Sequence, residues 1–421
     1  LNAGNITTSG GSLTLSDTLT FDGGGSISTG TGTLTLGGDT VNADTGGTIT
    51  LSGNLSLGGN AQTFAIDSGV TMNVSAAVSN GSITKNNPGT LLLSGANTFA
   101  GGITLNTGTL QLGNDQALGT GTFDLSGGTV QASGSARTLS NPATISASST
   151  IGGALDLTFS GAVTLTVSPT LTLDNTGVTT FSGAISHGAT SRNLTKDGTG
   201  TLVLSGANAY TGSTTVSAGV VNIRHNSALG TAAGATTVSS GAALELQSNI
   251  TVTGEGLTLT GTGIGNAGAL RNAANNNAWT GTIALGSGGA RINSDSGTLT
   301  LSGNFSGSAR DLTVGGAGNV TISGAIGTTS GSLTKDGSGT LTLSGANTFS
   351  GGTSIGAGTL ALGASDRLND TGSLNLATGS AFNLGGFNET ISALSGSGDI
   401  NLGSGALTVC DSSSTTFSGV I

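Results

Sequence analysis

Carboxylates that recur at a fixed spacing are the residues of this sequence with the clearest potential for chemistry. Asp22, Asp44 and Asp67 each follow a short alternating string, in TLTFDGG, TVNADTG and TFAIDSG, at offsets of 22 and 23 residues. If these strings are stacked strands, the carboxylates lie about 5 Å apart, and Ca²⁺ favours clustered oxygen ligands. The alternative is that each Asp hydrogen-bonds within its own turn. We predict turn contacts and no metal, cofactor or catalytic site, but the sequence leaves calcium binding by this series open.

The remaining candidates for catalysis or ligand binding are isolated residues. His187 and His225 lie in loop-like contexts among many serines, so composition alone leaves a Ser-His-Asp arrangement open,. No GxSxG elbow on a strand-to-helix turn is present to carry a nucleophile, and Cys410 has no His or Cys partner in a metal-ligand pattern. Gly263–Gly268 spells GxGxxG, but no helix is expected after it to bind a nucleotide phosphate,. For Trp279 we predict a packing role, with an exposed sugar platform as the alternative,.

The elements that must position these residues are repeated. Residues 82–113, 193–223 and 332–363 are three copies of one unit, which align without a gap. Internal repetition of this kind indicates a repeat architecture before any single residue is interpreted. Each copy contains a GTLxL-type string that recurs after 19 residues, a length that three short strands and their turns would fill,.

Two polar positions are shared by all copies of the unit. The three lysines of the protein precede DG or NN turns, and we expect them to face solvent: Lys85, Lys196 and Lys335. The asparagine of each GAN turn is expected to be a turn residue that tolerates the left-handed region: Asn97, Asn208 and Asn347,. Neither position predicts a functional site.

Alternation of Leu with Thr, and turn clusters rich in Gly, extend over the whole chain. Strings such as TLTL and TITLSG indicate half-buried strands, and the 78 Gly include many in turn signals between them,. These strands are too close together for crossover helices, and good helix formers are rare. The sequence therefore predicts an all-β chain with essentially no helix, a parallel β-solenoid (β-helix) of about 20 rungs in which neighbouring rungs complete each other's core.

Composition excludes several classes of function. The net charge of −10 disfavours nucleic-acid binding, which requires a basic surface,. With 1 Cys no intramolecular disulfide is expected,. No apolar run approaches the length of a membrane-spanning helix.

The repeated pattern LTKxGxGTLxLSGANTFxGGTxVxxGTLxLG resembles the passenger-associated repeat of bacterial autotransporters, the type V secreted proteins of Gram-negative cells. The resemblance implies a right-handed parallel β-helix stalk that is exported through an outer-membrane barrel to the cell surface. The chain opens at Leu1 without a signal peptide, and its last residues, TTFSGVI, match the TTFSGAI at residues 179–185 that leads into the second copy,. We therefore expect residues 1–421 to be one continuous β-helix segment of a longer protein whose barrel lies elsewhere.

The function expected from this reading is a non-catalytic extracellular surface protein of adhesin type, a rigid stalk or a fibre-forming passenger segment. Lateral or head-to-tail self-association and a glycan or cell-surface ligand are the expected partners, and the variable turns at 141–149, 187–192 and 271–279 are the places where recognition is expected. One alternative is a polysaccharide-acting β-helix enzyme. A second is an ice- or glycan-binding solenoid that uses outward threonine pairs such as Thr298 and Thr300. A strip of arginines and aspartates is the enzyme's best candidate, although a surface charge ladder explains it equally: Arg271, Arg291, Arg310, Asp295 and Asp311.

Overall fold

The computed structural model describes residues 1, 4–410 and 415–421. The chain is all-β, with 48% of its residues in strands, and its parallel sheets stack as a β-solenoid of about 19 turns. Among the described residues the helical structure is the 3-10 turn η1 (Ile264–Asn266). The prediction of an all-β parallel solenoid is confirmed. The residues form two compact units, Leu1–Tyr210 and Thr211–Ile421, and a single continuous coil over residues 1–421 stays a prediction.

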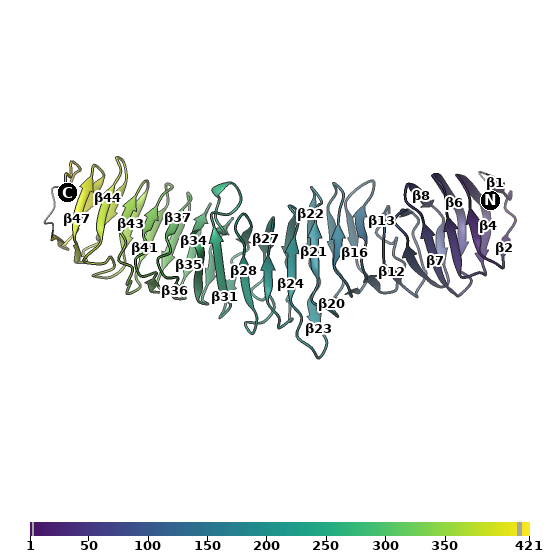
Figure 1. The fold of residues 1–421 in the computed structure, drawn as a ribbon, viewed down its shortest axis with the longest axis horizontal. Helices are drawn as coiled ribbons and strands as arrows, with labels where there is room; N and C mark the ends of the chain where they lie inside the picture. The colour runs from purple at the N-terminus through teal and green to yellow at the C-terminus, as the bar shows by residue number, and fades with distance from the viewer. Residues whose placement is uncertain (2–3, 411–414) are drawn as a thin grey trace. The chain divides into compact units, whose positions relative to one another are not determined.

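Unit 1 is a three-sided coil in which each side is a ladder of parallel strands (Figure 1). The first side contains β1 (Asn5–Thr7), β4 (Gly25–Leu36), β6 (Gly47–Ser56), β8 (Val70–Val74), β11 (Thr90–Leu93), β13 (Thr109–Leu112), β15 (Thr129–Ala132), β18 (Ser149–Ile151), β21 (Thr170–Leu173) and β24 (Leu194–Asp197). The second side contains β3 (Leu19–Phe21), β5 (Thr40–Ala43), β7 (Ala61–Ile66), β10 (Ser82–Asn86), β12 (Ile103–Leu105), β14 (Phe123–Leu125), β17 (Ala143–Ile145), β20 (Val163–Leu165) and β23 (Ile185–His187). The third side contains β2 (Leu13–Leu15), the second halves of β4 and β6, β9 (Ala77–Ser79), β16 (Arg137–Leu139), β19 (Leu157–Phe159), β22 (Val178–Phe181) and β25 (Thr201–Leu204).

Unit 2 is built in the same way. One side contains β26 (Thr214–Val216), β28 (Ala235–Val238), β31 (Gly256–Gly261), the first half of β34 (Ile283–Ser294), β36 (Phe305–Ser306) and β39 (Ile326–Gly327). The next contains β27 (Val220–Ile223), β29 (Ala243–Leu246), β32 (Leu270–Asn272), the second half of β34, β37 (Leu312–Gly315), β40 (Leu333–Lys335), β42 (Thr353–Ile355), β44 (Ser373–Leu376) and β47 (Ala393–Gly396). The third contains β30 (Thr251–Val252), β33 (Asn277–Trp279), β35 (Thr298–Leu301), β38 (Asn319–Ile322), β41 (Thr340–Leu343), β43 (Thr359–Leu362), β45 (Ala381–Asn383) and β48 (Asp399–Asn401), and β46 (Glu389–Ile391) pairs separately with β49 (Leu407–Val409).

The alternation in the sequence produces the core of each unit. Strands such as β21 and β41 alternate between buried and half-buried side chains, with the leucines inside and the threonines outside. Each turn of the coil alone leaves its apolar face uncovered, so the next turn must bury it. Leu91 pairs with Leu110 and Leu341 with Leu360, which confirms the 19-residue register in the first and third copies of the repeat.

The aligned strings near the N-terminus stack as predicted. Leu19 and Phe21 of β3 pair with Val41 and Ala43 of β5, and β5 pairs in the same way with β7. A fourth string of the same kind, TLTLDNTG at residues 170–177, forms β21 on a different side of the coil, where it pairs with β18. Local sequence similarity identified a strand there, but the side of the coil depends on the lengths of the intervening turns.

One side of the coil is a loop in the first and third copies of the repeat, the third side in unit 1 and the side of β36 and β39 in unit 2. Residues 94–102 and 344–352 contain no strand, so each 19-residue turn holds two strands and a loop instead of the three strands predicted. Backbone groups on that side need other partners, which the GAN asparagines supply.

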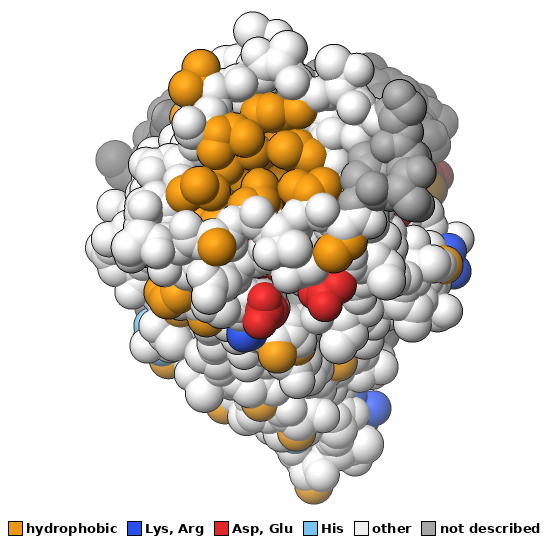
Figure 2. Space-filling view, turned by 90° about the vertical axis from the view of Figure 1, so that its left-hand side faces the viewer, with side chains coloured by type: hydrophobic (Ala, Val, Ile, Leu, Met, Phe, Trp, Pro, Cys, Tyr) orange, Lys and Arg blue, Asp and Glu red, His pale blue; other side chains and the backbone are white. Residues whose placement is uncertain are grey.

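Hydrophobic side chains are uncovered at the C-terminal end of unit 2 (Figure 2). Val420 is 70% exposed and Ile421 66% exposed. Separately, no helix among the residues that the structure describes has the length and apolar character to cross a membrane.

Candidate functional site

Asp22 and Asp67 lie at equivalent positions after their strands, and each accepts a hydrogen bond from the next turn of the coil. Asp22 Oδ1 accepts a hydrogen bond from Thr45 Oγ1 at 3.1 Å, and Asp67 Oδ1 accepts one from Asn87 Nδ2 at 2.7 Å. Each donor belongs to the following turn. The prediction that each side chain bonds within its own turn is therefore wrong for Asp22 and Asp67. Within the described ranges there is no group of three or more His, Cys, Asp or Glu residues that could hold a metal ion.

The histidines make contacts with their own turns. His187 Nδ1 lies 2.6 Å from the carbonyl oxygen of Gly188, and His225 Nδ1 lies 3.0 Å from Ser227 Oγ and accepts the Ser227 N–H. Cys410 is exposed, directly after the last residue of β49. His187 is the last residue of β23, and His225 lies in the bend that follows β27.

The repeat lysines are buried, and the prediction that they face solvent is wrong. Lys85 and Lys196 are 0% exposed and Lys335 is 2% exposed. Lys85 takes the place of an aliphatic residue in its ladder, between Phe64 of β7 and Leu105 of β12. The alternation of the strand explains this position, because the lysine is two residues after the inward Ile83.

Each ammonium group is held by main-chain carbonyl groups. Lys85 Nζ donates to the carbonyl oxygens of Asn86 and Asn87 at 2.7 Å and of Thr107 at 3.3 Å. Lys335 Nζ repeats this with Asp336, Gly337 and Ala357, at 2.7, 2.8 and 3.2 Å. In the second copy, Lys196 Nζ donates to Gly198 O at 2.6 Å. The lysine therefore ties the turn that follows it to the next turn of the coil, a structure that we call the lysine cage.

Burial lowers the pKa of these lysines. Desolvation lowers the pKa of Lys85, Lys196 and Lys335 to about 8 in each case, although Asp197 and Asp174 oppose the shift at Lys196 and Asp336 opposes it at Lys335. A glycine closes the cage in the first and third copies. A Cβ on Gly108 would lie 2.6 Å from Lys85 Nζ and 2.2 Å from Asn87 O, and Gly108 has φ +75°.

The GAN asparagines bridge three successive turns instead of adopting a left-handed conformation. Asn97 Oδ1 accepts the Val78 N–H at 2.9 Å, and its Nδ2 donates to Ala117 O at 2.6 Å. Asn347 makes the same pair of contacts, with Ile326 N at 2.9 Å and Arg367 O at 2.8 Å. None of the GAN asparagines is among the residues with positive φ. The predicted turn conformation is therefore wrong, and the side chain replaces the missing third strand.

Charged residues of unit 2 form a ladder along one side of the coil. Arg271 bonds Glu245 on one neighbouring turn and Asp295 on the other, each at 2.7 Å. Arg291 forms a two-pronged ion pair with Asp336, with both contacts at 2.7 Å. The ladder was one of the two predicted explanations of this strip.

Two contacts of the ladder differ from the predicted strip: that of Asp311 and that of Arg291. Asp311 accepts hydrogen bonds from the backbone N–H and the hydroxyl group of Ser332, which hold the pKa of Asp311 below its ordinary value. Arg291 reaches Asp336 across an intervening turn because that turn contributes Gly315, where a Cβ would lie 2.0 Å from Asp336 Oδ1. Of the two aspartates of the predicted strip, Asp295 is thus bound by Arg271 and Asp311 by Ser332.

Trp279 is fully buried, which confirms the packing role. Its Nε1 donates to the backbone carbonyl of Glu255 at 2.9 Å. Glu255 itself is 3% exposed and accepts a hydrogen bond from Thr236 Oγ1 at 2.9 Å, and burial raises the pKa of Glu255 to about 7. The alternative of an exposed sugar platform at Trp279 is excluded.

The outward threonine pairs are interrupted. Thr300 pairs with Thr321, which pairs with Thr342, but Thr298 pairs with Asn319. One threonine column of this side continues through three turns while the other does not.

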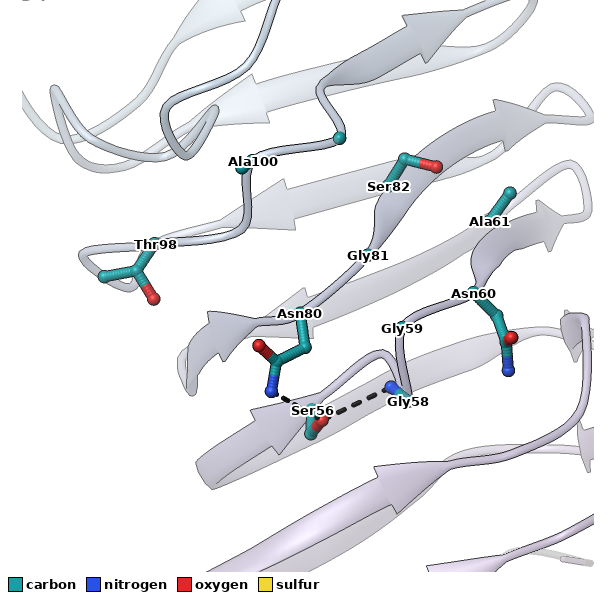
Figure 3. A pocket seen from close by; sticks show the side chains of 11 residues that line it. Ser56, Gly58, Gly59, Asn60, Ala61, Asn80, Gly81, Ser82, Thr98 and Ala100 are labelled. Atoms are coloured by element: carbon teal, nitrogen blue, oxygen red, sulfur yellow. Dashed lines mark hydrogen bonds between the residues drawn. The ribbon is translucent and has the colours of Figure 1, made fainter.

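A groove follows one corner of unit 1 (Figure 3). It has a volume of about 780 Å³ and is lined by residues between Ser56 and Ala61, between Asn80 and Ser82, and between Thr98 and Gly101, on three successive turns. A second hollow of about 310 Å³ shares Thr98 and continues over the turns that carry Gln116 and Asn141. Every residue that lines the two hollows is uncharged, and we call them together the corner groove.

Comparison with known proteins agrees with the resemblance seen in the sequence. A family model described as the passenger-associated-transport-repeat matches residues 83–112, 194–223 and 333–362. The chain is also 42% identical over 74 residues, 17% of its length, to the adhesin BmaC autotransporter of Brucella suis biovar 1 (strain 1330). This match covers 2% of the length of the relative. No solved structure matches the chain.

These matches confirm that the chain resembles an autotransporter passenger and carries three of its repeats. The three matched segments contain the three buried lysines. The lysine of each matched repeat is therefore a buried group that holds the coil together.

Proposed function

We propose that this chain is a non-catalytic segment of an adhesin-type protein that is exported to the cell surface. Its support is the similarity of its repeats to autotransporter passengers and to a named adhesin. The proposal that the segment is non-catalytic rests on one observation, which is that the polar side chains of the repeats bond to the backbone of the coil. The lysines of the first and third repeats bind backbone carbonyls, and the GAN asparagines of those repeats bridge backbone groups.

The arrangement of the charged residues favours this proposal over a polysaccharide-acting enzyme. Acid–base cleavage of a glycosidic bond requires two carboxyl groups that face the substrate. Glu245 and Asp295 instead share the guanidinium group of Arg271 at 2.7 Å. Both carboxylates therefore form ion pairs that link neighbouring turns of the coil.

Surface display tests the proposal. The 421-residue chain would be fused to an outer-membrane anchor on a non-adherent bacterium, and attachment to epithelial cells and to plastic would be counted. We expect more attached cells than for a strain that displays the anchor alone. Equal attachment by the two strains, or release of reducing ends from polysaccharides by the purified chain, would contradict the proposal.

We propose further that the chain's role is mechanical, as a stalk that carries binding elements away from the cell or as a unit of a fibre. Stacked aliphatic ladders and hydrogen bonds between successive turns support stiffness. Electron micrographs of the purified chain should show rods or filaments, and compact globules would contradict this role.

A further inference from the structure

We propose that the corner groove of unit 1 binds a neutral glycan chain, lying along the coil across five turns. This inference rests on the proposed adhesin role and names a ligand class for it. The register of β7, β10, β12, β14 and β17 places Asn60, Gly81, Gly101, Gly121 and Asn141 in one column along the groove. Five turns spaced about 4.8 Å apart give a groove of about 19 Å, which is long enough for a linear oligosaccharide.

The chemistry of the lining favours sugar hydroxyl groups. Asn and Ser or Thr side chains both donate and accept hydrogen bonds, as hydroxyl groups of a sugar do. Figure 3 shows Asn60, Asn80, Ser82 and Thr98 along the groove, on three turns. Because the lining carries no charge, it offers no counter-ion for an acidic polysaccharide.

One lining group, the side chain of Asn141, offers an acceptor atom to the groove. Asn141 is 7% exposed, and its Nδ2 donates to the carbonyl oxygens of Gly119 at 3.1 Å and Gly121 at 2.7 Å. Its Oδ1 accepts no hydrogen bond from any residue that the structure describes, although it belongs to a side chain that lines the groove. This oxygen can therefore accept a hydrogen bond from a ligand hydroxyl group in the groove.

A peptide fits this groove less well. Addition of a peptide strand needs an edge with free backbone groups. Here the N–H groups of Gly59, Ser82 and Gly101 are already bonded to the carbonyl groups of neighbouring turns, at 3.1, 3.1 and 3.0 Å. An apolar helix would need a hydrophobic lining, whereas the apolar lining residues are two alanines and a proline.

The test is titration of the purified 421-residue chain with cellotetraose, laminaritetraose, maltotetraose and chitotetraose, observed by saturation-transfer NMR. Tetragalacturonic acid and the peptide TVTVT serve as the acidic and peptide probes. Ala100→Arg fills the groove from an exposed position, and Ala136→Arg places the same side chain on an exposed turn outside it. We expect at least one neutral tetrasaccharide to bind, with a dissociation constant raised roughly tenfold by A100R and less than about twofold by A136R.

Three results would overturn the inference. They are no binding of any neutral tetrasaccharide, binding that A100R leaves unchanged, and binding of only the acidic or the peptide probe. Far-ultraviolet circular dichroism of both variants establishes that they are folded, and a misfolded A100R would be replaced by A61R, on the first turn of the groove. If the displayed chain promotes attachment while the purified chain binds no neutral tetrasaccharide, the groove assignment fails and the adhesin proposal stands.

Discussion

Replacement of Gly108 by alanine tests the lysine cage against a closely matched control. Gly108 has φ +75°, and Gly69, in the same unit, has φ +78°. An added Cβ at Gly108 would lie 2.2 Å from Asn87 O, 2.5 Å from Gly89 O and 2.6 Å from Lys85 Nζ, whereas at Gly69 it would meet nothing within 4 Å. The two substitutions therefore share a backbone cost and differ in the contact with the cage.

The magnitude follows from these two contributions. Left-handed backbone at a residue with a Cβ costs about 1–2 kcal/mol, and crowding against atoms that cannot move adds about 1–3 kcal/mol. Gly69→Ala should thus lower local stability by about 1–2 kcal/mol and Gly108→Ala by about 2–5 kcal/mol.

Hydrogen exchange measured by mass spectrometry is the appropriate assay, since a solenoid unfolds locally as well as globally. Peptides that cover residues 82–113 should lose about tenfold or more protection in G108A beyond the loss that G69A causes around its own turn, because about 1.4 kcal/mol corresponds to a factor of ten. Equal losses in the two variants would refute the lysine cage as a crowded site.

Three further predictions concern the other interior contacts. Because the folded chain releases the lysine protons near pH 8 while the unfolded chain keeps them to about 10.5, stability should rise between these values, by up to about 3 kcal/mol per lysine. Urea midpoints of the chain should rise over this range relative to a variant with all three lysines replaced by methionine, and parallel pH profiles would contradict the shift. Asn97→Ala orphans one buried N–H and one carbonyl group and should cost about 2–4 kcal/mol, seen as faster exchange at Val78, whereas N347A should leave Val78 unchanged. Gly315→Ala should displace the Arg291–Asp336 pair, so that the coupling measured by a double-mutant cycle of these two side chains, about 0.5–1 kcal/mol, falls to zero; an undiminished coupling would show that the pair does not need the glycine.

The sequence predicted the construction of the coil better than the use of its polar residues. Alternation and the 19-residue offset were sufficient for strands, parallel pairing and stacked cores, because a strand's inward face follows from period two alone. The same alternation could have placed Lys85 inside with Ile83, but the preference of lysine for solvent was given more weight. This preference does not take into account that three carbonyl groups from two successive turns surround the ammonium group of Lys85. Their convergence depends on the register between those turns.

The contacts of Asn97 and the two-turn reach of Arg291 were beyond prediction for a related reason. Their partners lie 19 to 45 residues away, on turns whose lengths vary. The corner groove likewise comes from short turns that no local pattern connects. One sequence-based hypothesis overlaps with the groove. The turn at 141–149 was expected to take part in recognition, and its first residue, Asn141, lines the groove.

The central claim is that the repeat is a unit of construction whose lysine is sealed inside the coil. Acetylation of the native chain with sulfo-NHS acetate at pH 7.5, followed by mass spectrometry, tests it directly, since the chain contains only Lys85, Lys196 and Lys335 besides its N-terminal amine. We predict prompt modification of the N-terminal amine alone, with the three lysines reacting only after denaturation in urea. Acetylation of the lysines in the native chain at the rate of the N-terminal amine would contradict it.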